Sequence, residues 1–127
     1  MKNLIETEQT PLALSQSRQV VLLLLDLQGN IHWCNPAFAQ QFTYANTHNF
    51  FDYICPSDRS KLAQALQNFS LHATEPDSLI LRLGKEGRQP TIVTFELFPL
   101  PVTNRTQPLI HLLGVDITAQ VLSLIHI

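Results

Sequence analysis

The stretch VVLLLLDLQGNIHWCNPAF, residues 20–38, decides the fold. It opens with a mostly apolar run, Val20–Leu27, that ends in Gln28-Gly29-Asn30. A short apolar run closed by a glycine-containing turn predicts a strand, and Ile31–Cys34 is then the returning strand of a hairpin. Asn35-Pro36 predicts a helix directly afterwards, because Asn is a preferred N-cap and Pro suits the first helical position.

The middle of the chain has a helical pattern. Phe38 and Phe42, four residues apart, give the first short helix an apolar face. Phe50–Ile54 has room for a turn or two of helix, and Pro56-Ser57-Asp58 opens the longest helix, with an acidic residue placed to favour the helix dipole. That helix has a core-facing stripe made of Leu62, Ala65, Leu66, Phe69 and Ala73.

After residue 77 the apolar period changes to two, which predicts strands at 79–83, 93–97 and 109–117. Two strands, a helical middle and a three-strand meander predict an α+β domain. Its five-stranded antiparallel sheet should have the short helices and the one longer helix packed on one face. Residues 1–19 are polar and divided by Pro11, so we expect an N-terminal arm or helix there.

Composition limits the functional classes. The 127 residues are 45% hydrophobic and 14% charged, with a net charge of -2, which fits one globular domain. No basic stripe is present to neutralise phosphates, so neither nucleic acid nor direct membrane contact is expected. The apolar run Val20–Leu25 is far shorter than the roughly 20 residues of a spanning helix. Residues 1–19 lack the apolar stretch that is typical of a signal peptide. We therefore expect a cytoplasmic domain in which Cys34 and Cys55 are reduced thiols.

Several motifs in this order resemble the PAS (sensory box) domain family. Asp26-x-x-Gly29-x-Ile31 followed by Asn35-Pro36-Ala37-Phe38 resembles the first hairpin of the family and its entry into a helix. Phe51 to Arg59 resembles the passage "F-x-x-I-x-P-x-D-R", and Leu83 to Gly87 resembles the charged hairpin turn. Gly114 to Thr118 resembles the ending "G-x-x-D-I-T". The resemblance implies an arm at 1–19, a PAS-like fold at 20–120, and at 121–127 the start of a linker to a further domain.

This resemblance also implies a function. PAS domains of bacterial signalling proteins sense a signal, form dimers and act on a C-terminal output domain, here expected to be a diguanylate cyclase (GGDEF) domain or a histidine kinase. Asp116, Ile117 and Thr118 are then the residues that transmit the signal. Two alternatives stay open: a ligand-free domain for protein interaction or dimerisation, and a small α+β enzyme with a pocket.

A ligand pocket is expected between the helices and the sheet, and the resemblance implies that its candidates are apolar. Haem would require an axial histidine, for which His72 is the candidate, but a histidine late in a helix more often interacts with the helix C-terminus. A flavin-reactive cysteine has a sequence context that neither cysteine shows. The histidines have no metal-ligand spacing, and no catalytic motif is present. The sequence thus names no cofactor, metal or catalytic residue and leaves a small metabolite open. The pocket candidates are Phe38, Phe42, Phe51, Ile54, Leu66, Phe69, Val93, Phe95 and Leu113.

Overall fold

The computed structural model describes residues 20–42, 47–69, 77–85, 87–100 and 108–125. The expected arm at 1–19 and the haem candidate His72 lie outside these residues. The elements in chain order are β1 (Val20–Asp26), β2 (Ile31–Cys34), α2 (Pro36–Gln41), the 3₁₀ helices η1 (Phe50–Tyr53) and η2 (Pro56–Asp58), α3 (Arg59–Gln67), β3 (Asp77–Leu83), β4 (Thr91–Leu100), β5 (Leu109–Asp116) and α4 (Thr118–Ile125).

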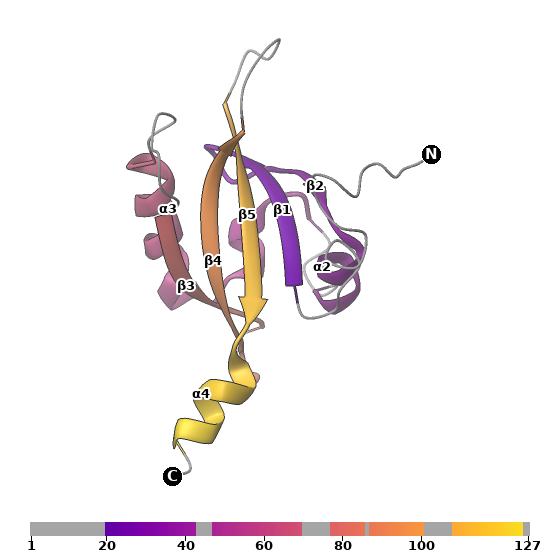
Figure 1. Ribbon diagram of the computed structural model, residues 1–127, viewed down its shortest axis with the longest axis vertical. Coiled ribbons are helices and arrows are strands. Elements are labelled where there is room, and N and C mark those ends of the chain that lie inside the picture. The colour runs from indigo at the N-terminus through magenta and orange to yellow at the C-terminus, as the bar shows by residue number, and fades with distance from the viewer. Residues whose placement is uncertain (1–19, 43–46, 70–76, 86, 101–107, 126–127) are drawn as a thin grey trace.

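The five strands form one antiparallel sheet in the order β2-β1-β5-β4-β3 (Figure 1). Strand β1 pairs with β5 along its whole length, from Val20 opposite Val115 to Asp26 opposite Leu109. The first and last strands are therefore neighbours at the centre of the sheet. The predicted α+β architecture, with its order of strands and helices, is confirmed.

The β1–β2 turn is organised by one buried carboxylate. Asp26 Oδ1 accepts hydrogen bonds from the backbone N–H groups of Gln28 and Asn30, each at 2.9 Å, and Asp26 Oδ2 lies 3.1 Å from His32 Nε2. Gly29 has a φ of +89°, which the tight turn requires and which glycine adopts freely. Burial by itself would raise the pKa of Asp26, but the hydrogen bonds from His32 and Asn30 outweigh it and lower that pKa.

Asn35 joins the hairpin to α2. Its Oδ1 accepts from the N–H of Phe38 at 3.2 Å, which caps the helix as the sequence predicts, and also from the N–H of Leu22 at 3.1 Å. Its Nδ2 donates to the carbonyl of Val20 at 2.9 Å. The side chain is fully buried, so these bonds satisfy polar groups that have no access to water.

The core lies between one face of the sheet and the helical segments. Alternate residues of β1, β3, β4 and β5 point into it, and α2, η1 and α3 supply the opposite side. Burying each leucine side chain contributes about 1.5–3 kcal/mol. The core residues of the sheet are Val21, Leu23, Leu25, Leu81, Leu83, Val93, Phe95, Leu97, Ile110 and Leu112, and those of the helical side are Ala37, Phe38, Phe42, Phe50, Tyr53, Ile54, Leu62 and Leu66.

Asp58 stands at the start of α3, where the sequence predicts an acidic residue, and it has a further role that the sequence does not predict. Its carboxylate makes no capping hydrogen bond to α3. It instead accepts from Arg82 in β3, at 2.8 Å from the backbone N–H and at 3.1 Å and 2.8 Å from the guanidinium. The hydrogen bond from the Arg82 side chain lowers the pKa of Asp58. The pair therefore fastens the start of α3 to an edge strand.

No helix among the described residues is long and apolar enough to cross a membrane.

Candidate functional site

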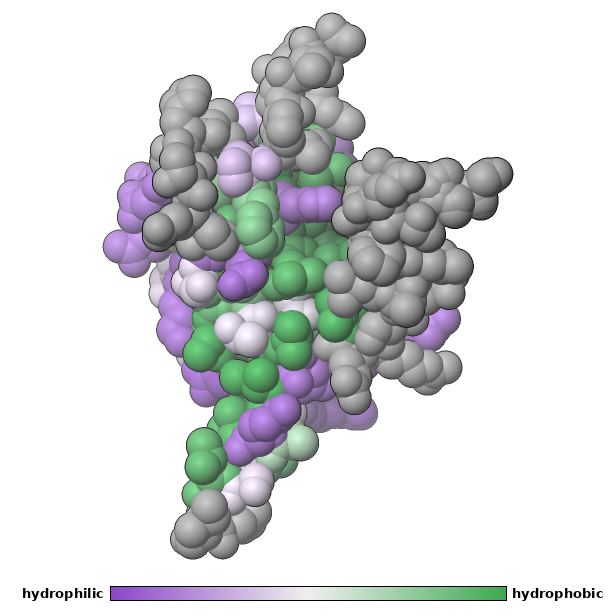
Figure 2. All heavy atoms as spheres, viewed as in Figure 1, coloured by the Kyte–Doolittle hydropathy of each residue, from purple (hydrophilic) through white to green (hydrophobic). Residues whose placement is uncertain are grey.

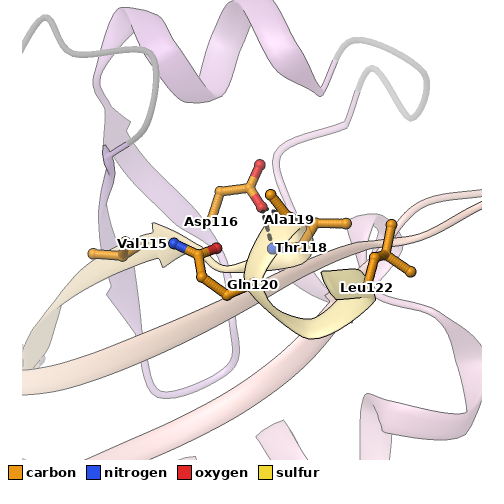
Figure 3. A pocket seen from close by; sticks show the side chains of 6 residues that line it. All are labelled: Val115, Asp116, Thr118, Ala119, Gln120 and Leu122. Carbon is orange, nitrogen blue, oxygen red and sulfur yellow. Dashed lines mark hydrogen bonds between the residues drawn. The ribbon is translucent and has the colours of Figure 1, made fainter. Parts of the chain in front are cut away.

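The candidate site lies where the last strand becomes the last helix. Strand β5 ends at Asp116, Ile117 connects, and α4 begins at Thr118. Figure 3 shows the side chains around this junction, which line an open hollow of about 470 Å³. The lining residues are Val115, Asp116, Thr118, Ala119, Gln120 and Leu122.

The carboxylate of Asp116 organises the first turn of α4. Asp116 Oδ1 accepts from the backbone N–H of Thr118 at 2.8 Å and from Thr118 Oγ1 at 2.6 Å (Figure 3). Helix N-termini leave backbone N–H groups without intrahelical partners and are the positive end of the helix dipole. A carboxylate therefore stabilises them both as a hydrogen-bond acceptor and through its negative charge. The N–H of Val121 then bonds to the carbonyl of Ile117 at 3.0 Å, which closes the first helical turn.

The same turn is fastened to the neighbouring strand β4. The backbone N–H of Ile92 donates to Thr118 Oγ1 at 2.8 Å, and the N–H of Ile117 donates to the carbonyl of Ile92 at 2.8 Å. The hydroxyl of Thr118 thus accepts from β4 and donates to Asp116. The three predicted transmission residues, Asp116, Ile117 and Thr118, form one connected unit that ties α4 to the sheet. Their part in signalling stays a prediction.

Helix α4 extends beyond the end of the sheet (Figure 1). Its sequence, TAQVLSLI, is mostly apolar, yet Leu124 is 71% exposed, while Val121 and Leu122 are half-buried. An apolar helix that leaves its own domain in this way presents a surface suited to another helix.

The sheet face opposite the helices is also apolar. Figure 2 looks onto this face and shows hydrophobic side chains gathered over the central strands and continuing onto α4. Register places Leu22 opposite Leu113, and Val115 between Val20 and Thr94, on this outer face. Val115 is 38% exposed, and Trp33 and Ile80, on the two edge strands, are 46% and 51% exposed.

One histidine lies on the outer face. His111 in β5 pairs with Leu24 of β1 and with Phe98 of β4. Its partial burial among these neighbours lowers the pKa of the imidazole. The outer face therefore favours the neutral form of this side chain.

The predicted pocket residues are mostly packed against one another. Phe38, Phe42, Ile54, Leu66, Val93 and Phe95 are buried in the core, and Phe51 and Phe69 are partly buried against it. The Phe50 ring lies 5.6 Å from that of Phe95 and 6.1 Å from that of Phe38, in edge-to-face geometry between helices and sheet. Aromatic rings thus occupy the centre of the expected pocket. Ligand binding by these residues stays a prediction.

The inward orientation expected for Leu113 is wrong. Side chains alternate along a strand, and Leu113 pairs with Leu22 and Glu96 on the outer face, whereas its neighbour Leu112 is fully buried in the core. The overlooked signal is Gly114. A glycine inside a strand indicates a close approach by another group, here the ring of Phe95, and so places Gly114 and Leu112 on the inner face.

Sequence reasoning also missed Ile92, which contributes through its backbone. Backbone contacts of this kind leave no side-chain signal in the sequence.

Among the described residues no group of three or more His, Cys, Asp or Glu side chains is placed to hold a metal ion. Cys34 and Cys55 are free thiols, and burial raises the pKa of Cys34.

Solved structures share this architecture. The PAS domain of an HTR-like protein from Haloarcula marismortui aligns over 89% of this chain and 99% of its own, with a TM-score of 0.64 and 17% identity. The N-terminal domain of a diguanylate cyclase with PAS/PAC sensor from Marinobacter aquaeolei aligns over 80% and 98%, with a TM-score of 0.61 and 7% identity. The PAS domain of Bordetella pertussis BvgS aligns over 96% and 95%, with a TM-score of 0.56 and 17% identity.

Sequence comparison gives no such match, since neither a family model nor a curated protein matches the chain. The likeness therefore lies in the fold, a five-stranded antiparallel sheet with helices. The chain has the fold of PAS domains.

Proposed function

We propose that this chain is a non-catalytic sensory module of a cytoplasmic bacterial signalling protein, which dimerises and passes a signal to a C-terminal output domain. The observation that carries the proposal is the double fastening at the β5–α4 junction. Thr118 Oγ1 binds the N–H of Ile92 in β4 and the carboxylate of Asp116 at the end of β5. The direction of α4 thereby depends on the relative position of two sheet strands.

The physical consequence is a mechanical link between the sheet and α4. Each hydroxyl hydrogen bond contributes about 1 kcal/mol, so the link is strong enough to set the position of α4 and weak enough to be changed by a bound ligand or partner. A small shift of β4 against β5 would alter both bonds of Thr118. Because α4 is a hydrogen-bonded helix and not a flexible connection, a change in its direction would be passed on to any domain that follows it.

Dimerisation is supported by the two apolar surfaces. The outer sheet face and α4 lie next to each other in Figure 2 and form one continuous surface. Val115 and Leu124 are exposed members of this surface, whereas Leu22 is only 6% exposed. Exposed apolar side chains that adjoin one another mark interaction sites in soluble domains. By family resemblance the output domain would be a diguanylate cyclase or a histidine kinase, and one structural neighbour is the N-terminal domain of a diguanylate cyclase.

The test is a chimera in which residues 1–127 replace the PAS domain of a diguanylate cyclase. Thr118→Val removes the hydroxyl and keeps the shape of the side chain, and Thr118→Ser is the matched control that keeps the hydroxyl. We expect Thr118→Val to change the rate of cyclic di-GMP formation several-fold while Thr118→Ser stays close to the parent. Equal rates for all three chimeras, with folding intact, would refute a role for this junction in output.

A second candidate, a ligand-free dimerisation domain, is favoured by the apolar outer face alone. Val115→Lys would place a charge on this face without entering the core, since Val115 is 38% exposed. Both proposals include a dimer, so sedimentation equilibrium separates them only together with the output of the chimera. If Val115→Lys, or deletion of residues 1–19, abolishes a dimer while Thr118→Val leaves chimera output unchanged, the simpler interaction role is the better description.

A further inference from the structure

A second pocket lies away from the β5–α4 junction, between β2, α2 and the segment that leads into η1. Its volume is about 320 Å³, near the lower end of the roughly 300–1,000 Å³ typical of small-molecule sites. It shares Phe38 and Phe42 with the expected pocket between the helices and the sheet, but it lies on the side of α2, because no described residue of α3, β3 or β4 lines it. The lining residues are Ile31, Cys34, Phe38, Ala39, Phe42, Thr47, His48 and Tyr53.

The floor of this pocket is aromatic. Phe38, Phe42 and Tyr53 are between 2% and 5% exposed, so they lie beneath the exposed rim residues Ala39 and His48. The Phe38 ring lies 5.2 Å from that of Phe42 and 5.0 Å from that of Tyr53. The hydroxyl of Tyr53 donates to the carbonyl of Thr47 at 2.9 Å, which fixes the ring in place. The planes of the Phe42 and Tyr53 rings are tilted by 37° and 61° from that of Phe38, so the rings form an apolar floor and not one flat face. An aromatic ligand would pack against this floor in tilted or edge-to-face contacts.

The polar groups around the rings are few and carry little charge. Among the described residues that line the pocket there is no Lys, Arg, Asp or Glu. Cys34 contributes a thiol whose pKa is raised by burial, and His48 contributes an imidazole at the rim. Thr47 Oγ1 lies 2.8 Å from the carboxylate of Asp52, so a negative charge lies close to this rim and disfavours an anion.

From this geometry we propose that the pocket binds a small uncharged aromatic molecule with one hydrogen-bonding group. The rings would hold its plane, and the thiol of Cys34 or the imidazole of His48 would receive or donate the single hydrogen bond. Haem and flavin carry anionic groups and many more atoms, and this pocket suits neither of them.

The pocket is also connected to the sheet. Phe38 stands in the first turn of α2, and its N–H bonds to Asn35, whose side chain also binds Leu22 and Val20 of β1. Strand β1 pairs directly with β5, which leads to the β5–α4 junction. The role of the pocket as an input site of the sensory module rests on the proposed function. Ligand binding by the pocket does not depend on it.

The experiment is an NMR titration of the ¹⁵N-labelled chain with indole. Among the described residues, we expect the changes in amide chemical shift to be confined to 31–42 and 47–53. Ala39→Leu fills the rim from an exposed position of α2 and should weaken binding at least tenfold. Gln40→Leu, on the same helix but outside the pocket, is the matched control and should bind like the parent. Ala39→Gln serves as a second blocking variant.

Three results would overturn the inference. They are undiminished binding by both Ala39 variants, shifts gathered at the hollow of Val115 to Leu122, and tighter binding of benzoate or benzylammonium than of indole. The outcome is independent of the junction, because indole binding is measured on the chain alone and chimera output is measured without indole. A failure of Thr118→Val to alter output would leave a positive titration standing, and a failed titration would leave the junction standing.

Discussion

Replacing Gly114 by alanine tests the packing that places β5 against the core. A Cβ at this position would overlap Cε1 of Phe95, lie 2.7 Å from its Cδ1 and lie 2.8 Å from Val21 Cγ2. Phe95 is fully buried, and the ring of Phe50 stands 5.6 Å away from it, so the ring has little freedom to move. The strand or the ring must shift, and overpacking of this kind typically costs about 1–3 kcal/mol.

We expect Gly114→Ala to lower the free energy of unfolding by about 3 kcal/mol, the upper end of this range, because the added carbon meets side chains from two strands. For a domain of this size that corresponds to a fall in Tm of roughly 10 °C. Urea denaturation of the purified chain measures the free energy of unfolding. Gly87→Ala is the contrasting variant: its φ is +85° and nothing lies within 4 Å, so only a backbone penalty of about 1 kcal/mol is expected.

A double-mutant cycle identifies the cause. If the Phe95 ring is what the new methyl group meets, Phe95→Leu should relieve the strain, and the double variant should be at least about 1 kcal/mol more stable than the sum of the single effects predicts. Two results would refute the packing explanation. One is a loss in free energy of unfolding below about 0.5 kcal/mol for Gly114→Ala, which is roughly the experimental error. The other is strict additivity with Phe95→Leu.

Three further outcomes follow from the structure. Asn35→Ala removes the cap of α2 and two buried hydrogen bonds to β1, so urea denaturation should show a loss of about 2–3 kcal/mol, and a loss below 1 kcal/mol would contradict it. Because burial lowers the pKa of His111 from its ordinary 6.5, the unfolded chain gains a proton near that pH before the folded chain does, so the free energy of unfolding should fall as pH drops below 6.5. His111→Gln should flatten this slope, and an unchanged slope would argue against partial burial of the imidazole. Asp58 has a lowered pKa, so its contribution is present above its ordinary 3.8 and is lost only as pH falls below that value; Asp58→Asn should reduce the acid sensitivity seen in that lower range, and an unaltered acid transition would argue against the Arg82 contact.

The sequence predicts most of the fold because its signals are local. The hairpin follows from Gly29 and the apolar run before it, and α2 follows from the Asn35 cap, which the structure confirms in position and in hydrogen bonding. The change of apolar period after residue 77 gives the three later strands. Each of these signals depends on residues close to one another in the chain.

The errors and omissions arise from long-range contacts. Asp58 stands at the start of a helix, but its carboxylate binds Arg82, which lies 24 residues away. Leu113 follows an apolar pattern that does not distinguish the two faces of β5, and only the contact between Gly114 and Phe95 decides between them. The resemblance implies a role for Thr118, but its partner Ile92 contributes only a backbone N–H, which the side-chain pattern does not reveal.

The most direct test of the account is amide hydrogen exchange at the β5–α4 junction. Thr118→Val removes two hydroxyl hydrogen bonds, so the Ile92 and Val121 amides should exchange about tenfold faster, corresponding to roughly 1.4 kcal/mol. The Leu112 amide in the centre of β5 should be unchanged, and Thr118→Ser should match the parent. Unchanged exchange at Ile92 and Val121, or an equal acceleration throughout the sheet, would contradict the claim that this threonine fastens α4 to β4.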